Sequence, residues 1–248
     1  MASLKWCSKI AQLGGLKMRS RVRYFFIMLQ FLFTVTTTIV IMYIFKKHNH
    51  KIRQTWGQLQ LKILGIKLEF EGQLDQTAQM VVFNHQSILD IIIFEALYPK
   101  NLAWVAKKQI ADLPFLGQIL KIPDMIIIDR ENKAGLVKLI KQTKQHLNNG
   151  RPIAIFPEGT RSDGKKMLKF KMGAKIIAEK HNTKIQPILI IGSRNCIDSQ
   201  QLKAKKATVS IVYLPAVYAK KSENWYKELE QNMNYEFNKR IKKYEIYI

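Results

Sequence analysis

A run of 22 uncharged residues, Tyr24 to Phe45, constrains the fold of this chain more than any other feature. As a helix it is long enough to cross a hydrocarbon layer of about 30 Å. Basic residues flank it on both sides, and the segment after it, KKHNHK, offers no small-residue cleavage site, so we expect the run to stay attached. A core helix is the alternative, but basic clusters at both ends favour membrane contact.

The charge of the chain is strongly positive, with 41 Lys and Arg against 18 Asp and Glu, a net +23. Six basic residues precede Tyr24 and four more follow by Arg53, all before the first acidic residue, Glu69. A single span would send one basic cluster to the far side of the membrane. We therefore favour a helix or bent helical pair lying in one leaflet on anionic headgroups over a spanning helix.

From about residue 65, short β-branched runs alternate with helical periodicities. This alternation predicts an α/β domain over residues 61–248, with a mixed, largely parallel sheet of about seven strands covered by helices, after an N-terminal helical membrane-attachment segment over residues 1–60. The predicted strands are Ile66 to Glu71, Met80 to Phe83, Leu102 to Ala106, Met125 to Ile128, Ile153 to Phe156, Ile185 to Ile191 and Thr208 to Tyr213. The predicted helices are Ile88 to Tyr98, Lys133 to Leu147 and Met172 to Lys180, followed by one that carries a stripe of Trp225, Leu229, Met233, Phe237 and Ile241. In the second of these helices, Leu136, Ile140, Thr143 and Leu147 form one face.

The first polar motif follows the second predicted strand and reads Asn84-His85-Gln86-Ser87-Ile88-Leu89-Asp90. It places His85 at the end of a strand, where sites on α/β sheets tend to lie, and Asp90 in the first turn of the next helix. From there Asp90 can orient His85 as a general base. Alternatively, Ser87 to Asp90 is a capping box, in which Asp90 only satisfies helix amides.

The second polar motif, Phe156 to Ser162, also follows an apolar strand. Gly159 permits close backbone approach, and the Arg161 guanidinium suits a phosphate. The spacing is not that of a P-loop, and Glu158 would repel a phosphate unless it holds a backbone amide, a cation or a hydroxyl group. An ordinary turn with a solvated Arg161 is the alternative.

Taken together, the motifs resemble the glycerolipid acyltransferase family. The resemblance covers about residues 60 to 215, with departures at Gln186, where the family is usually aliphatic, and in the basic stretch Lys203 to Lys206. Its four ordered blocks match Asn84 to Asp90, Gly117 to Arg130, Phe156 to Ser162 and Ile185 to Ile188, with two further matches at Ala106 to Lys108 and Phe170 to Ala174.

This resemblance implies transfer of a fatty acyl group from a thioester to the sn-2 hydroxyl of lysophosphatidate, giving phosphatidate. His85 would be the general base, with Asp90 orienting it and no acyl-enzyme. The resemblance also implies the substrate-binding residues. Arg161, Lys107 and Arg130 would bind the phosphate, and Glu158, Gly159 and Thr160 would shape the glycerol site.

The expected partners are a membrane lipid acceptor, an anionic membrane surface and a donor, either acyl-CoA or an acidic acyl carrier protein. Because such donors are cytosolic, we expect attachment through residues 1–55 at the cytoplasmic face of a membrane, the inner one if the source is bacterial. We expect neither a cofactor nor a metal. Another lysophospholipid or glycerol 3-phosphate is the alternative acceptor, and a membrane-tethered nucleic-acid-binding protein is the alternative class.

Overall fold

The computed structural model describes the backbone of residues 2–129, 134–220 and 224–245, and the side chains of residues 18–129, 135–220 and 224–242. Its helices are α1 (Ala2–Ile44), the 3-10 turn η1 (Lys46–His48), α2 (Asn49–Leu64), α3 (Leu89–Leu97), α4 (Lys108–Ala111), α5 (Gln118–Lys121), α6 (Ala134–Asn148), α7 (Met172–His181), α8 (Ser193–Cys196) and α9 (Trp225–Glu245). Its strands are β1 (Lys67–Glu71), β2 (Met80–Phe83), β3 (Ala103–Lys107), β4 (Ile126–Ile128), β5 (Ile153–Ile155), β6 (Lys184–Ile191), β7 (Ile197–Asp198), β8 (Lys203–Ala204), β9 (Thr208–Tyr213) and β10 (Val217–Tyr218).

Within the described chain, one sheet of eight strands has the order β1-β9-β6-β2-β5-β3-β4, with β10 paired to the start of β6. The pairs from β6 to β4 are all parallel, whereas β9 runs antiparallel to β6 and parallel to β1. The predicted mixed, largely parallel sheet is confirmed. Residues that follow β2, β3, β4, β5 and β6 therefore meet at one edge of the sheet.

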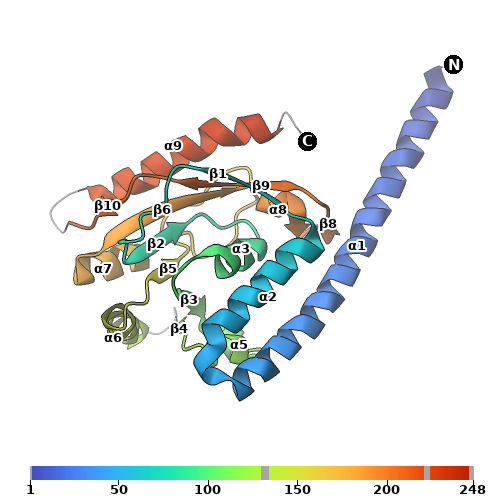
Figure 1. Cartoon of the computed structure of the whole chain (residues 1–248). Helices are drawn as coiled ribbons and strands as arrows, with labels where there is room; N and C mark the ends of the chain where they lie inside the picture. Colours follow the sequence, from blue (N-terminus) through green and yellow to red (C-terminus); the bar gives the residue numbers. More distant parts are fainter. Residues whose placement is uncertain (1, 130–133, 221–223, 246–248) are drawn as a thin grey trace.

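Helices cover both faces of this sheet (Figure 1). In β2, Met80 and Val82 face a core shared with α6, α7 and α9, while Val81 and Phe83 face a core shared with α2 and α3. Successive strand residues point to opposite faces, so a strand buried on both sides reads as an unbroken apolar run. The predicted stripe on α9 lies in the first of these cores, with Ile241 partly buried at its end.

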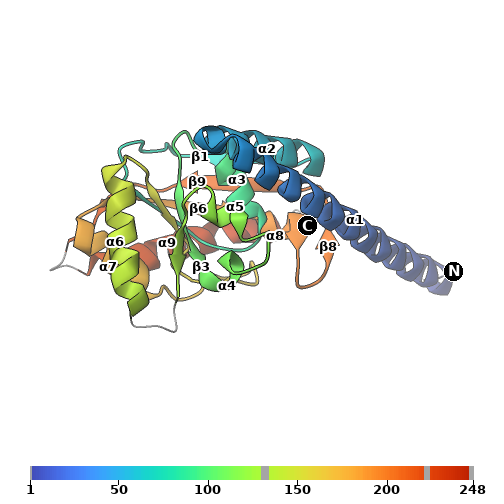
Figure 2. The same cartoon turned by 90° about the horizontal axis from the view of Figure 1, so that it is seen from below.

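The N-terminal helix α1 has 43 residues and is longer than the apolar run that predicted it. After the turn η1, α2 returns beside it, so the two form a helical hairpin, and the first part of α1 projects beyond the rest of the molecule (Figures 1 and 2). Residues 18–44 are long and apolar enough to cross a membrane, and only 28% of the window that meets this test is buried. The hairpin therefore presents a large apolar surface.

One boundary and one helix face expected from the sequence are arranged differently in the structure. The expected division at residue 60 falls inside α2, and Leu64 at the end of this helix lies in the core shared with β2 and α3. The predicted apolar face of α6, which comprised Leu136, Ile140, Thr143 and Leu147, is wrong at its first position, because Leu136 is exposed and Leu139 is buried instead.

The physical reason for the shifted face is that α6 buries polar side chains. The hydroxyl of Thr143 lies 2.9 Å from His181 Nε2 and donates to the carbonyl of Ile140 at 3.0 Å, and His146 is buried beside it. Satisfied polar groups of this kind are invisible to apolar periodicity.

Candidate active site

The side chain of Asn84 fixes the end of β2 to its neighbour β6. Its amide donates to the carbonyl of Ile190 at 2.9 Å, and its carbonyl accepts from Ile190 N at 2.7 Å. His85 follows directly, and its Nδ1 lies 2.8 Å from Oδ2 of Asp90, in the first turn of α3. The strand end and the helix start thus meet through one imidazole and one carboxylate.

Asp90 is completely buried, and the oxygen that contacts His85, Oδ2, also accepts hydrogen bonds from the backbone. Its Oδ2 accepts hydrogen bonds from the backbone N–H groups of Gln86 at 2.7 Å and Ser87 at 2.9 Å. An ionised carboxylate only accepts, so His85 Nδ1 must be the donor, which leaves Nε2 with a free lone pair. Asp90 therefore makes the contacts that both sequence-based interpretations, orientation of His85 and helix capping, require.

Ser87 was predicted to be a helix cap, and the structure gives its hydroxyl a different main partner. The hydroxyl donates to the carbonyl of Ile197 at 2.8 Å, while the N–H of Leu89 approaches it only at 3.4 Å. Ser87 is buried, and its hydroxyl joins the turn after β2 to the segment after α8. It is not presented as a nucleophile.

Glu158 holds the two polar motifs together. Its Oε1 accepts from the backbone N–H of His85 at 2.7 Å, and its Oε2 accepts from Leu168 N at 2.6 Å. The carbonyl of His85 in turn accepts from Ser162 N at 2.8 Å. The backbone of His85 is thus held on both sides. Of the three partners that the sequence left open for Glu158, a backbone amide, a cation or a hydroxyl group, the structure shows backbone amides.

The electrostatic setting of Glu158 is unusual for a carboxyl group. Burial raises its pKa to about 7, and the hydrogen bonds from Leu168 and His85 act in the opposite direction. Because only 1% of Glu158 is exposed, it shapes the site by holding the backbone rather than through an open surface of its own.

An aromatic stack supports His85, and sequence reasoning did not assign it. The Phe156 ring lies on the His85 ring, with 3.9 Å between centroids and 18° between planes, and Trp104 of β3 stacks on Phe156 at 5.4 Å. Phe156 begins the second motif directly after β5, so its position at the shared sheet edge was the available signal. The stack fixes the plane of the imidazole.

The remaining candidate residues lie at the same sheet edge. Lys107 ends β3 and is exposed, and Gly159 and Thr160 follow β5. Arg161 is exposed and donates to the hydroxyl of Ser199 at 3.0 Å. Arg130, two residues after β4, lies outside the described residues.

One departure from the family pattern is structural. Gln186 is fully buried in β6, where its amide accepts from Asp75 N at 2.9 Å and donates to the carbonyls of Pro187 and Leu214. It is paired with Val81 of β2, before the edge that carries His85. Gln186 therefore joins loops and strands and does not alter the site.

Among the described residues, no group of three or more His, Cys, Asp or Glu side chains is placed to hold a metal ion. The site consists instead of an oriented imidazole, two backbone-binding carboxylates and exposed basic side chains.

Comparisons with known proteins show which family and which fold this chain is similar to. A family model described as Acyltransferase matches residues 65–191. A 1-acyl-sn-glycerol-3-phosphate acyltransferase of Helicobacter pylori is 42% identical over 205 residues, 81% of this chain and 86% of that protein. One from Cocos nucifera is 30% identical over 69% of this chain, which spans only 56% of that protein. The crystal structure of the 1-acyl-sn-glycerophosphate acyltransferase PlsC from Thermotoga maritima matches 88% of this chain and 96% of its own, with a TM-score of 0.72 and 24% identity.

Proposed function

Because this chain belongs to the acyltransferase family, we propose that it transfers a fatty acyl group from an acyl thioester to the sn-2 hydroxyl of lysophosphatidate, giving phosphatidate. It is an O-acyltransferase by family and by the names of its relatives. The observation that carries the proposal is the contact between His85 Nδ1 and Asp90 Oδ2, which leaves Nε2 of a 14% exposed imidazole ready to accept a proton.

The reaction needs a base because an alcohol is a poor nucleophile while it keeps its proton. The acceptor hydroxyl gives its proton to His85 Nε2 as its oxygen attacks the thioester carbonyl and forms the new C–O bond. The tetrahedral intermediate then collapses, the C–S bond breaks, and the proton on Nε2 passes to the departing thiolate. Asp90 stabilises the imidazolium between these steps.

Each supporting contact has a task in this mechanism. Phe156 keeps the imidazole in one plane, and Glu158 holds the backbone of His85, so both are positioning residues. The reaction needs no acyl-enzyme, since the hydroxyl attacks the thioester directly.

We assign binding of the acceptor phosphate to the exposed basic side chains at the sheet edge. Arg161 supplies a guanidinium that is anchored to the neutral hydroxyl of Ser199, which leaves its charge for a phosphate, and Lys107 supplies an ammonium. We include Arg130 with them by resemblance. Gly159 and Thr160 then border the glycerol moiety.

The test of this proposal is purified full-length protein in detergent, offered lysophosphatidate, other lysophospholipids or glycerol 3-phosphate, each with acyl-CoA or acyl carrier protein as donor. We expect lysophosphatidate to give the highest kcat/KM, and phosphatidate to be the product by mass spectrometry. Arg161→Gln and Lys107→Gln should chiefly raise the KM for lysophosphatidate, because the phosphate contacts are the same in ground and transition states. Faster acylation of another acceptor would overturn the assignment.

A further inference from the structure

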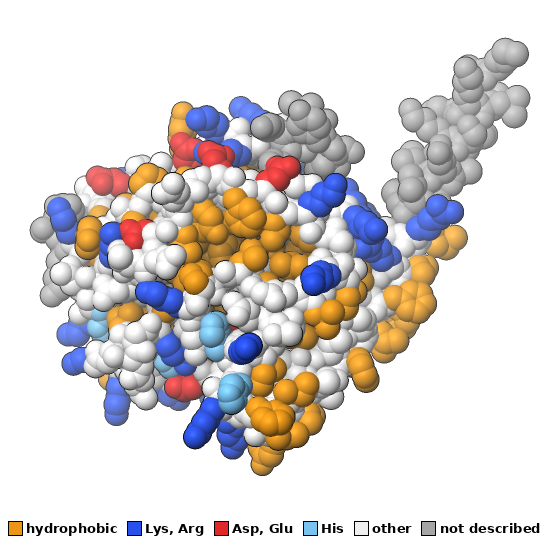
Figure 3. Space-filling model, in the orientation of Figure 1, with side chains coloured by type: hydrophobic (Ala, Val, Ile, Leu, Met, Phe, Trp, Pro, Cys, Tyr) orange, Lys and Arg blue, Asp and Glu red, His pale blue; other side chains and the backbone are white. Residues whose placement is uncertain are grey.

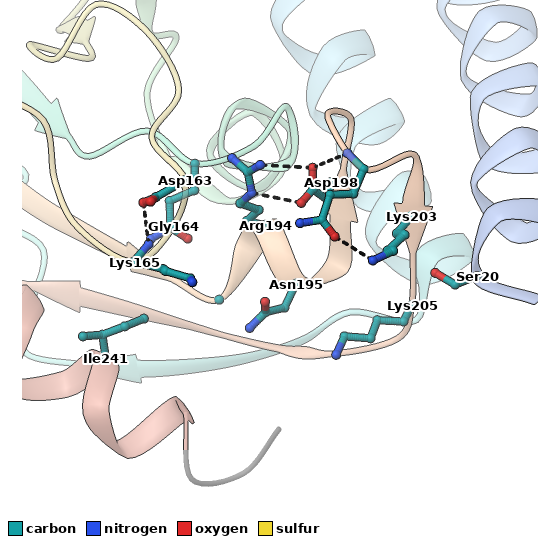
Figure 4. Close-up of a pocket in the computed structure, with 13 residues that line it drawn as sticks. Ser20, Asp163, Gly164, Lys165, Arg194, Asn195, Asp198, Lys203, Lys205 and Ile241 are labelled. Carbon is teal, nitrogen blue, oxygen red and sulfur yellow. Dashed lines mark hydrogen bonds and ion pairs between the residues drawn. The ribbon is translucent and has the colours of Figure 1, made fainter. Parts of the chain in front are cut away.

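A cavity of about 350 Å³ lies beside the catalytic turn, and the mechanism above does not use it. Its walls come from separate parts of the chain that include α1, the loop after the second motif, α8, the β7–β8 ribbon and Ile241 of α9 (Figure 4). Gln86, the residue after His85, also lines it. The cavity is therefore built against the turn that carries the general base.

The cavity is basic. Lys165, Lys203 and Lys205 line it, and the last two belong to the basic stretch that departs from the family pattern. Figure 4 shows Lys165 and Lys205 extending into the space between α8 and the end of α9. In the part of the chain that the structure describes, neither lysine has a carboxylate within salt-bridge distance, and Lys203 Nζ bonds only the neutral Gln201 side chain at 2.6 Å.

The two acidic residues of the cavity are already satisfied. The Asp198 carboxylate pairs with Arg194, whose Nε lies at 3.0 Å and Nη2 at 3.2 Å. It also accepts hydrogen bonds from the backbone N–H groups of Gln200 and Gln201. Asp163 accepts from its own turn, from Lys165 N at 2.9 Å and Lys166 N at 3.4 Å. The lysine ammonium groups are therefore left to an outside anion.

A second, independent feature points to a ligand. Gln86 is 3% exposed, and its side-chain Nε2 has no hydrogen-bond partner among the described residues, although its carbonyl oxygen is 3.4 Å from the hydroxyl of Ser193. A buried donor without an acceptor is costly unless a ligand supplies one. Ammonium and amide donors together match the oxygens of a phosphate.

We propose that this cavity is a second phosphate site, in which Lys165, Lys205 and the Gln86 amide bind the phosphate monoester of a substrate. The inference rests on the proposed function, because that reaction brings two such groups to the protein: the phosphate of lysophosphatidate and the 3′-phosphate of a coenzyme A donor. The site is distinct from Arg161, which does not line the cavity. Contact of Ser20 Oγ with the carbonyl of Ala204 at 3.3 Å joins α1 to β8 beside the site, so the bound group lies next to the membrane-binding hairpin.

The test measures binding without turnover, by titration calorimetry on the full chain in detergent. One arm compares coenzyme A with dephospho-coenzyme A, and the other compares a short-chain lysophosphatidate with the matching monoacylglycerol. We expect the double variant Lys165→Gln, Lys205→Gln to weaken binding of at least one of the two phosphate monoesters about tenfold or more, and to leave its phosphate-free analogue unchanged. The arm that responds identifies the source of the phosphate. A response of coenzyme A places its 3′-phosphate here, whereas a response of lysophosphatidate moves the acceptor phosphate from Arg161 and Lys107 to this cavity.

Two further variants sharpen this result. Lys227→Gln removes an exposed charge on α9 and should bind like the wild type. Gln86→Met removes the amide at similar size and should weaken the same probe severalfold, with the melting temperature showing that the protein is folded. The site is refuted if neither monoester binds the wild type, if neither loses affinity beyond the Lys227→Gln control, or if the phosphate-free analogue loses as much. If the phosphate effect is found in a protein that does not acylate lysophosphatidate, only the proposed function fails.

Discussion

Asp90 combines two tasks that are usually considered separately. Its Oδ2 receives two backbone N–H groups and the imidazole N–H of His85, so the carboxylate shapes the turn and selects the tautomer at once. The sequence placed Asp90 in the first turn of a helix, which allowed either task. Only the backbone path between the strand end and the helix start shows that one oxygen reaches all three donors.

Replacing Asp90 with Asn tests this double role. An amide keeps an acceptor for the turn but carries no charge to stabilise the imidazolium, and its NH₂ group can face the imidazole and favour the wrong tautomer. We expect kcat to fall about 10²-fold or more, while the melting temperature falls by only a few degrees. Steady-state kinetics and thermal unfolding on the same preparation measure both. Wild-type turnover in Asp90→Asn would leave Asp90 with the capping role alone.

Glu158 gives the protein a specific dependence of stability on pH. Its folded-state pKa of about 7 lies above its ordinary value of 4.5, so the folded protein takes up a proton that the unfolded chain does not bind between these values. The stabilisation from this group is therefore fully present below pH 4.5 and is lost as the pH rises through about 7.

Glu158→Gln should remove this component. The difference in melting temperature between wild type and variant is expected to decline from about pH 4 to about pH 7 and to stay flat above, because the Gln side chain does not titrate. Thermal unfolding in a series of buffers with matched ionic strength measures it. A difference that does not change with pH would contradict the assignment of this pKa to Glu158.

At the scale of elements, α2 packs against the α/β domain as well as against α1 in the helical hairpin. Arg53 of α2 is buried and pairs with Glu95 of α3, whose other carboxylate oxygen accepts from Trp104 Nε1 at 2.6 Å. Trp104 stacks on Phe156, which stacks on His85. A series of direct contacts thus joins α2 to His85.

This arrangement changes what a truncation can remove. The sequence indicated membrane attachment through residues 1–55, but deletion of that whole segment would take Arg53 away from Glu95. Burial raises the pKa of Glu95, and Arg53 offsets that effect. A truncation that preserves the domain should end before Asn49, where α2 begins.

The variant Arg53→Met tests the buried pair. Removing the cation leaves a buried carboxyl without its partner, which costs about 3–5 kcal/mol in comparable cases. We expect a large fall in the free energy of unfolding, and partial recovery in the double variant Arg53→Met, Glu95→Gln. Denaturant unfolding of the three proteins measures it, and equal stability of Arg53→Met and wild type would show that the pair contributes nothing.

The elements that the sequence predicted and those it missed differ in length. The seven expected strands lie within one residue of the observed ones at nearly every end, because central parallel strands read as apolar runs that end at polar or turn residues. The two-residue strands β7, β8 and β10 and the four-residue helices α4, α5 and α8 are too short for any periodicity to show. The stack of Phe156 on His85 and the pair of Arg53 with Glu95 depend on long-range packing that no local pattern encodes.

For the whole molecule, the placement of α1 decides how the enzyme meets its membrane. Apolar side chains are exposed along one side of α1, while basic side chains gather near the upper part of the helix in Figure 3. The other side contacts α2 and the α/β domain. Arg23 Nη2 donates to the carbonyl of Leu64 at the end of α2 at 2.8 Å, Ser20 Oγ donates to the carbonyl of Ala204 in β8 at 3.3 Å, and Ile27 lies in the core shared with α3. Beyond its projecting first part, α1 therefore lies beside the α/β domain (Figures 1 and 2), which favours the in-leaflet arrangement.

Cysteine labelling in sealed vesicles of known orientation tests this arrangement. Single cysteines replace Ser3 and Lys47 in a Cys7→Ser background. Cys196 can remain, because it is buried and burial raises its thiol pKa to about 12. We expect both positions to react with an impermeant reagent from the cytoplasmic face alone. Labelling of the two positions from opposite faces would establish a span.

The central claim is that His85 accepts the proton of the lysophosphatidate hydroxyl during direct acyl transfer. It is tested most directly by the initial rate of phosphatidate formation from lysophosphatidate and the better of the two donors in vesicles, for the wild type and for His85→Ala. The backbone contacts of His85 with Glu158 and Ser162 do not need the imidazole, so His85→Ala should fold and melt like the wild type. The account predicts that His85→Ala lowers the rate by about 10²-fold or more; phosphatidate formation by that variant at the wild-type rate would contradict it.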